Sequence, residues 1–273
     1  LFSGLVCGQE SSYDRLRVGD ANGKVVVPTN QVLSPAGKQI PIGGRPTDLT
    51  LSPDKKWLAI LDRNHVALIN PKTGEIASRG SHGSGSYAGI LFTADGKTLL
   101  ASSNKGQIAV FDVETDGKLR AAKPIELPLL KNARGQNLAN GETGPQSPNQ
   151  SAHPPGADSK TALPIGLALS RDGKTLWAVL NLRSTLAQID LAEAKVLKEI
   201  PVGNAPYGVV LVGDKAYVSN WAGRHPDKKD PTGPSGSGTP VRVDSKRNIA
   251  SEGSVSVVDL KEGKELKQIL VGL

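Results

Sequence analysis

The chain of 273 residues is 37% hydrophobic but only 4% aromatic, and it carries 31 glycines and 19 prolines, which indicates an aliphatic core and many turns. Its net charge of +7 comes from basic residues scattered near predicted turns, without the basic stripe and stacking aromatics that nucleic-acid binding requires. No apolar run approaches the roughly 18 residues of a membrane helix, so the composition argues against both a nucleic-acid partner and a membrane span.

Residues 1–16 are interpreted as a signal-peptide remnant and leader. The stretch LFSGLVCGQ combines a short apolar run with small residues and then becomes polar, as signal peptides do near their cleavage site. It holds the only cysteine, Cys7, but Val6 before it is too bulky for a lipoprotein cleavage site. Cleavage would leave a mature protein without cysteine. We therefore expect a periplasmic or secreted bacterial protein, although a cytosolic chain can also lack thiols.

Residues 17–273 contain an internal repeat. Four segments share one alternating apolar pattern: HVALINPKTGE from His65, QIAVFDVETDGK from Gln107, TLAQIDLAEAK from Thr185 and SVSVVDLKEGK from Ser254. Each follows a second apolar block whose turn contains an aspartate, at Asp54, Asp95, Asp172 and Asp214. These aspartates are 41, 77 and 42 residues apart, which predicts a repeating unit with one long insertion in the middle.

Each unit is expected to form four antiparallel strands. Short runs of Val, Ile, Leu and Ala bounded by Gly, Asp and Pro favour strands, and Asp-Gly at 95–96 and 172–173 is typical of tight β-hairpin turns. Such a unit cannot bury both faces of its sheet alone, but units stacked around an axis can, as in a β-propeller. The predicted fold is therefore an all-β propeller of four-stranded antiparallel blades. The expected blades are residues 43–82, 84–127, 161–203 and 204–273, with insertions at about 128–160 and 223–250.

Two kinds of residue recur at corresponding places in these units. Glycines at the start of the strand nearest the axis would let the backbones of neighbouring blades approach; they are Gly89, Gly166 and Gly208. Asparagines near the end of the following strand can bond their own backbone and start a turn, or contact a ligand; they are Asn104, Asn181 and Asn220.

The stretch AYVSNWAGRH, residues 216–225, carries the sharpest pattern. Its YVSN is similar to the Tyr-Val-Thr-Asn signature of YVTN-type β-propeller repeats, and SPDKKW and SRDGKTLWAVLN resemble the first hairpin of that repeat. Residues 25–54 and 201–226 resemble proteins that join such a propeller to a downstream phosphoesterase of the alkaline-phosphatase superfamily. The resemblance implies a ring of about seven blades, so the four seen here would be an incomplete ring within a longer protein.

The sequence offers no clear catalytic constellation. Its histidines lack the spacing of a zinc motif; they are His65, His82, His153 and His225. GSGSYAG, residues 83–89, has neither phosphate-loop nor dinucleotide-binding spacing. The turn aspartates are expected on separate blades, where they cannot form a carboxylate pair. We therefore predict no catalytic residue, no metal and no cofactor in this segment.

The insertion at 223–250 is rich in glycine and proline and is basic, with aspartates that partly offset the charge. It is interpreted either as a linker-like loop or as a lid or docking arm, because loops on a rigid scaffold are where binding usually occurs. In the second interpretation Arg224 would bind an anionic group bidentately, with Trp221 as a wall. The predicted ligand- or partner-binding residues are Asn181, Asn220, Trp221, Arg224 and His225.

Three functional hypotheses remain. The first is a non-catalytic binding and scaffold segment of a bacterial envelope or secreted protein whose full-length form, as the resemblance implies, is a phosphoesterase. Its partner would be its own downstream domain or another protein, with an anionic small ligand as a further candidate. The second is a stand-alone YVTN-type propeller that acts as an interaction module. The third is a propeller enzyme such as a sugar-lactone hydrolase, for which Asp48 is the only acidic residue at the matched starts of the innermost strands.

Overall fold

The computed structural model describes residues 19–21, 24–29, 31–34, 36–83, 87–128, 162–234 and 240–272. The proposed signal-peptide remnant and nearly all of the 128–160 insertion therefore lie outside the described residues. The chain divides into two compact units, Leu1–Pro41 and Ile42–Leu273. In the first unit, β1 (Gly19–Ala21), β2 (Lys24–Val26) and β3 (Val32–Leu33) form an antiparallel sheet.

The second unit is built from four antiparallel sheets, here called blades I to IV. Blade I consists of β4 (Pro46–Leu51), β5 (Leu58–Asp62), β6 (His65–Ile69) and β7 (Ile76–Ser81). Blade II consists of β8 (Ile90–Phe92), β9 (Thr98–Ser103), β10 (Gln107–Val113) and β11 (Leu119–Ala121), with the short β12 (Ile125–Glu126) also paired to β10. Blade III consists of β13 (Pro164–Leu169), β14 (Thr175–Leu180), β15 (Thr185–Asp190) and β16 (Lys195–Pro201), with the 3-10 turn η2 (Asn181–Arg183) after β14. Blade IV consists of β17 (Pro206–Val212), β18 (Lys215–Asn220), β21 (Gly253–Asp259) and β22 (Lys264–Val271).

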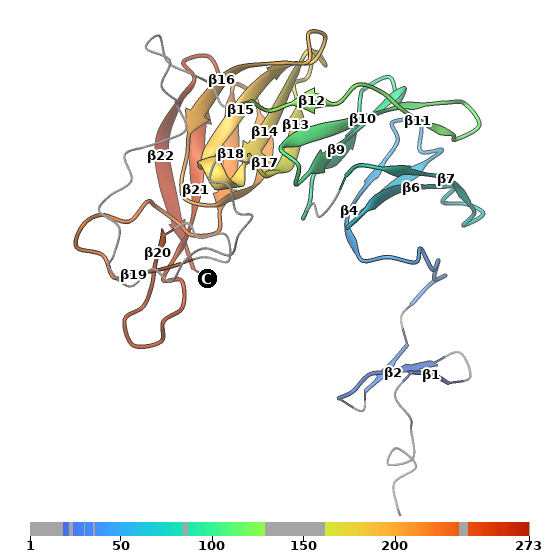
Figure 1. Ribbon diagram of the computed structural model, residues 1–273, viewed down its shortest axis with the longest axis horizontal. Helices are drawn as coiled ribbons and strands as arrows, with labels where there is room; N and C mark the ends of the chain where they lie inside the picture. Colours follow the sequence, from blue (N-terminus) through green and yellow to red (C-terminus); the bar gives the residue numbers. More distant parts are fainter. Residues whose placement is uncertain are drawn as a thin grey trace, which may run out of the picture. The chain divides into compact units, whose positions relative to one another are not determined.

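The four blades are arranged as a propeller. They lie side by side in chain order (Figure 1), and the first strands of successive blades, β4, β8, β13 and β17, are neighbours of one another. Each blade runs in simple up-and-down order from this innermost strand outward. The prediction of an all-β propeller with four blades in this chain is confirmed. Among the described residues, no helix has the length and apolar character needed to cross a membrane.

The core consists of apolar layers between adjacent blades. In blade III, Leu176 and Ala178 pack against side chains of blade II such as Ile108, whereas the alternate residues Trp177 and Val179 pack against blade IV. This period of two is what a strand with both faces buried requires, because successive side chains point to opposite faces. Each inner blade thus needs a neighbour on both sides.

Gly89, just before β8, and Gly166 on β13 allow the backbones of neighbouring blades to approach, as predicted, whereas a Cβ on Gly208 would meet only the Ser219 hydroxyl of its own blade. A Cβ atom on Gly89 would overlap the carbonyl oxygen of Ile165 in blade III. A Cβ on Gly166 would lie 2.7 Å from the carbonyl oxygen of Tyr207 and 2.9 Å from the Cα of Gly208, both in blade IV. Both distances are shorter than a carbon side chain tolerates, so only glycine fits at these two positions.

The turn aspartates of blades I to III share one hydrogen-bonded geometry and lie on separate blades. In each turn the hydroxyl two residues earlier donates to the aspartate Oδ1 at 2.6 Å, and the amide N–H two residues later donates to the same oxygen. Chiefly because of the hydroxyl bond, the pKa of each carboxyl lies below its ordinary value; these residues are Asp54, Asp95 and Asp172. Asp214 in blade IV departs from the pattern and pairs with Lys261 at 2.8 Å.

The outward faces of the two end blades are apolar and exposed. On blade I, Leu49 is 63% exposed and pairs with Ile60, on the face opposite Ala59 and the core. On blade IV, Val210 is 60% exposed on the face opposite Val209, and Val212 and Ile269 are exposed as well. These faces correspond to those that the inner blades bury against their neighbours.

Candidate functional site: an insertion on blade IV

An insertion between β18 and β21 forms the most elaborate feature outside the blades. Its described residues include a short antiparallel hairpin of β19 (Thr232–Pro234) and β20 (Pro240–Arg242), followed by a bridge between Val243 and Ala250. Val241 of this hairpin is buried against Ala205 and Ala222. The hairpin is therefore anchored on blade IV by an apolar contact, although its strands are rich in proline and glycine.

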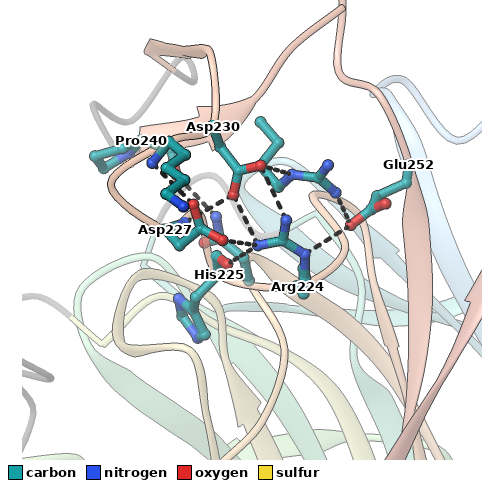
Figure 2. A network of polar contacts seen from close by, with 9 residues as sticks. Arg224, His225, Asp227, Asp230, Pro240 and Glu252 are labelled. Atoms are coloured by element: carbon teal, nitrogen blue, oxygen red, sulfur yellow. Dashed lines mark hydrogen bonds and ion pairs between the residues drawn. The ribbon is translucent and has the colours of Figure 1, made fainter.

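Asp230 is the centre of an ion-pair network that holds the insertion (Figure 2). The Nη1 and Nη2 atoms of Arg224 donate to the two carboxylate oxygens of Asp230 at 2.8 and 2.9 Å, a bidentate pair. The Nε atom of Arg242 lies 2.9 Å from Asp230 Oδ1, and its Nη1 contacts Glu252. The backbone N–H of Asp227 also donates to Asp230 Oδ2 at 2.8 Å. These contacts connect the start, middle and end of the insertion.

The network has a clear electrostatic signature. The hydrogen bond from Arg224, followed by that from the Asp227 N–H and the contacts with Arg242, lowers the pKa of Asp230 to about 2. The hydrogen bond to Glu252 and that to Asp230 raise the pKa of Arg242. At neutral pH Asp230 is therefore ionised, and its carboxylate lies between the guanidinium groups of Arg224 and Arg242, which would otherwise repel.

Replacing Arg224 with methionine should raise the pKa of Asp230 from about 2 toward its ordinary value of 3.8, because the largest cause of the shift is removed. In the wild-type protein the folded pKa lies below the unfolded one. The network therefore stabilises the insertion above about pH 4, and this stabilisation is lost as the pH falls toward about 2. A carbon-13 NMR titration of the Asp230 carboxyl measures both midpoints. A midpoint that is the same in wild type and variant would contradict the assigned pairing, and Arg120→Met in blade II serves as the control.

The structure brings four of the five predicted site residues into one region. Asn220 ends β18, and Trp221, Arg224 and His225 follow it. Asn181 lies in η2 of blade III, where its Nδ2 donates to the carbonyl oxygen of Pro206 at 3.0 Å. Pro206 is the register partner of Asn220, so Asn181 reaches the same end of blade IV.

These predicted residues have different environments. Asn220 is buried, and its Nδ2 donates to the hydroxyls of Ser254 and Ser256 at 3.0 and 2.8 Å. The Nε2 of His225 donates to the carbonyl oxygen of Val202 at 3.0 Å. Arg224 is engaged by Asp230, whereas Trp221 is 54% exposed. Trp221 and His225 are thus the exposed members of the predicted set, and the ring of His225 already binds a backbone carbonyl.

Trp221 borders a surface hollow of about 590 Å³. The other lining residues all belong to the insertion; they are Thr232, Gly233, Pro234, Val241, Val243, Asn248, Ile249 and Ala250. The lining is mostly apolar, and Ile249 is exposed like Trp221. Sequence reasoning singled out Trp221 but not the opposite wall, nor the Asp230, Arg242 and Glu252 side chains that hold it. Across the described ranges, no group of three or more His, Cys, Asp or Glu side chains is placed to hold a metal ion.

Comparisons with known proteins support the fold but identify no protein family for this chain. No protein-family model matches the chain, and no curated protein matches it. Its structure is similar to hydrazine synthase of Kuenenia stuttgartiensis, with a TM-score of 0.56 and 16% identity over 88% of this chain and 53% of that chain. It is also similar to the periplasmic gluconolactonase PpgL of Pseudomonas aeruginosa, with a TM-score of 0.52 and 20% identity over 91% of this chain and 63% of that chain. These likenesses agree with the propeller fold. The chain spans between half and two thirds of the length of these two proteins.

Proposed function

We propose that this chain is the non-catalytic binding and scaffold segment of a longer bacterial envelope or secreted protein. The observation that carries the proposal is the exposed apolar surface on the outward faces of blades I and IV, around Leu49 and Val210. Inner blades bury the same faces against a neighbour, and burying one such side chain contributes about 1.5–3 kcal/mol. The occupant of both faces is further propeller sequence of the same protein. The two similar structures are longer than this chain, which covers 53% and 63% of their lengths.

The remaining parts of the proposal rest on sequence patterns. The YVSN at 217–220 and the resemblance of residues 25–54 and 201–226 support YVTN-type repeats followed by a phosphoesterase domain. That domain, rather than these blades, would hold the metal ions and the catalytic residues, so no cofactor is assigned to this segment. The apolar stretch within residues 1–16 supports export to the periplasm or the medium. The principal partner is then the protein's own downstream domain.

In the full-length protein, Leu49→Asp and Val210→Asp should each lower the free energy of unfolding by about 2 kcal/mol, because each places a charge between packed blades. Leu197→Asp is the matched control, since Leu197 is exposed on β16 and its replacement should change stability by no more than about 0.5 kcal/mol. Urea unfolding of the three variants measures the difference. Equal, small effects in all three would overturn the scaffold proposal, because the faces would then be open in the complete protein.

The full reading frame tests the identity of the downstream part. We expect further repeats of the same pattern and then an α/β region rich in metal ligands. A stop codon directly after three more blades would instead favour the second hypothesis, a stand-alone propeller that acts as an interaction module.

A propeller enzyme such as a sugar-lactone hydrolase is the third candidate, favoured by a single acidic residue near the axis. Both carboxylate oxygens of Asp48 accept backbone N–H groups at 2.8 Å, Oδ2 from Gly89 of blade II and Oδ1 from Leu49. The hydrogen bond from Gly89 gives Asp48 a structural role, because it joins the first strand of blade I to blade II. Metal titration and a lactone-hydrolysis assay of the full-length protein decide the question, and activity abolished by Asp48→Asn would establish the enzyme.

A further inference from the structure

The hollow beside Trp221 has the character of a recognition surface. Trp57 and Trp177 are buried between blades, whereas Trp221 presents more than half of its surface to solvent. Ile249, also exposed, belongs to the same lining. Large apolar side chains gathered at one concave place on a protein surface mark binding sites more often than scattered ones do.

The walls of the hollow are held in place before any partner binds. Gly233 and Pro234 follow Asp230 closely in the chain, and Val241 and Val243 flank Arg242 in and after β20. Because side chains alternate along a strand, Arg242 points to the ion-pair network while Val241 and Val243 point to the other side. The network thus fixes the backbone that carries the wall. A preformed wall lowers the conformational entropy lost on binding.

The lining chemistry favours an apolar side chain over a sugar. Apart from the indole of Trp221, only Thr232 and Asn248 contribute polar side chains to the lining. A sugar ring presents hydroxyls all around its edge, and a site for it needs many hydrogen-bond partners. An aromatic or branched aliphatic side chain needs none and can fill a volume of this size together with its neighbours.

The charges near the hollow indicate an acidic partner. Lys246 lies in the turn that joins two lining residues, Val243 and Asn248. Among the described residues, no ion pair involves Lys246 or the exposed Lys228 and Lys229 earlier in the insertion. Of the aspartates of the insertion, Asp230 is paired with two arginines, Asp244 with Arg247 at 3.1 Å and the exposed Asp227 with Arg224 at 3.7 Å. Lys246, which adjoins the lining in the chain, therefore gives this side of the hollow a positive charge.

We propose that the hollow binds an apolar or aromatic side chain of a peptide segment from a partner protein, with carboxylates flanking that side chain. Trp221 and Ile249 form the pocket for the apolar anchor, and Lys246 attracts the flanking carboxylates. The residues that line this hollow are different from the exposed residues on the outward faces of blades I and IV, such as Leu49 and Val210.

Three fluorescein-labelled peptides test the proposal by fluorescence anisotropy with the full-length protein. They are Asp-Glu-Phe-Leu-Glu-Asp, its basic counterpart Lys-Lys-Phe-Leu-Lys-Lys, and the anchorless Asp-Glu-Ser-Ser-Glu-Asp. The first should bind at least about tenfold more tightly than the other two, since it alone has both the anchor and the matching charge. Its affinity should fall with rising salt, because the lysines are exposed.

Variants of the hollow and a control variant elsewhere on the surface show whether the peptide binds at this hollow or nonspecifically to exposed apolar residues. Trp221→Ala and Ile249→Ser should each weaken binding of the first peptide about tenfold, and Lys246→Glu should weaken it and reduce its salt dependence. Leu197→Ser, an equally exposed apolar residue on blade III, should leave binding unchanged. Equal binding of all three peptides, an effect of Leu197→Ser equal to that of Trp221→Ala, or binding of maltose but of no peptide would overturn the proposal. The stability effects of Leu49→Asp and Val210→Asp are measured separately, so failure here does not affect the scaffold assignment.

Discussion

Replacing Arg183 with methionine should lower the free energy of unfolding by about 3–5 kcal/mol, because it leaves a buried carboxylate without its counter-ion. The Nη1 of Arg183 lies 2.6 Å from Glu199 Oε1, and the two side chains are only 2% and 6% exposed. The guanidinium also donates to the carbonyl oxygens of Leu127 and Pro128 at 2.7 and 3.1 Å. It thereby joins the end of blade II to blade III. Urea unfolding monitored by circular dichroism measures the loss.

An exposed ion pair of similar geometry provides the matched control. Arg120 and Asp112 are 2.8 Å apart in blade II, but their side chains are 69% and 43% exposed. Arg120→Met should therefore cost no more than about 1 kcal/mol. The double variant Arg183→Met with Glu199→Met should recover part of the loss, because no charge is then buried alone. Similar losses for Arg183→Met and Arg120→Met would show that burial does not decide the strength of the pair.

The repeat predicted the blades well because blade formation depends on local information. Apolar alternation is read directly from neighbouring residues, and the Asp-Gly turns at 95–96 and 172–173 have the positive φ that glycine accepts, +69° at Gly96 and +71° at Gly173. The short β12 was not foreseen. It pairs with Gln107 and Ile108 at the start of β10, the same two residues that pair with the end of β9, and nothing in Ile125–Glu126 itself indicates a strand.

The ion-pair network was harder to predict, because its contacts depend on the register of the β19–β20 hairpin, whose residues have little tendency to form strands. The composition of the insertion pointed to Trp221 and Arg224, but not to the partner of Arg224. The hairpin strands Thr-Gly-Pro and Pro-Val-Arg contain residues that disfavour strands, so their pairing could not be expected from propensity. That pairing places Arg242 where it contacts both Asp230 and Glu252. From the sequence, Arg224 was expected to bind an anionic ligand. In the structure it binds the carboxylate of Asp230 in the same chain.

Replacing Gly89 with alanine should lower the free energy of unfolding by at least about 3 kcal/mol, because two independent costs combine at this residue. Its φ of +101° lies in a region that residues with a Cβ rarely adopt. The added carbon would also overlap the carbonyl oxygen of Ile165 in the next blade. That oxygen accepts a hydrogen bond from the Ser102 hydroxyl at 2.7 Å, and the Gly89 N–H donates to Asp48 at 2.8 Å. A shift of the backbone at Gly89 would therefore disturb contacts among blades I, II and III together.

Gly173→Ala separates the conformational cost from the steric one. Gly173 also has a positive φ, +71°, but a Cβ there would meet no atom within 4 Å. Gly173→Ala should lower the free energy of unfolding by only about 1–2 kcal/mol, which is the strain of a residue with a Cβ in the left-handed conformation. The difference between the two variants, measured by urea unfolding, then reports the close approach of blades II and III at the axis. Equal losses would mean that the blades can separate locally at no cost, which is incompatible with a propeller whose innermost strands are packed backbone against backbone.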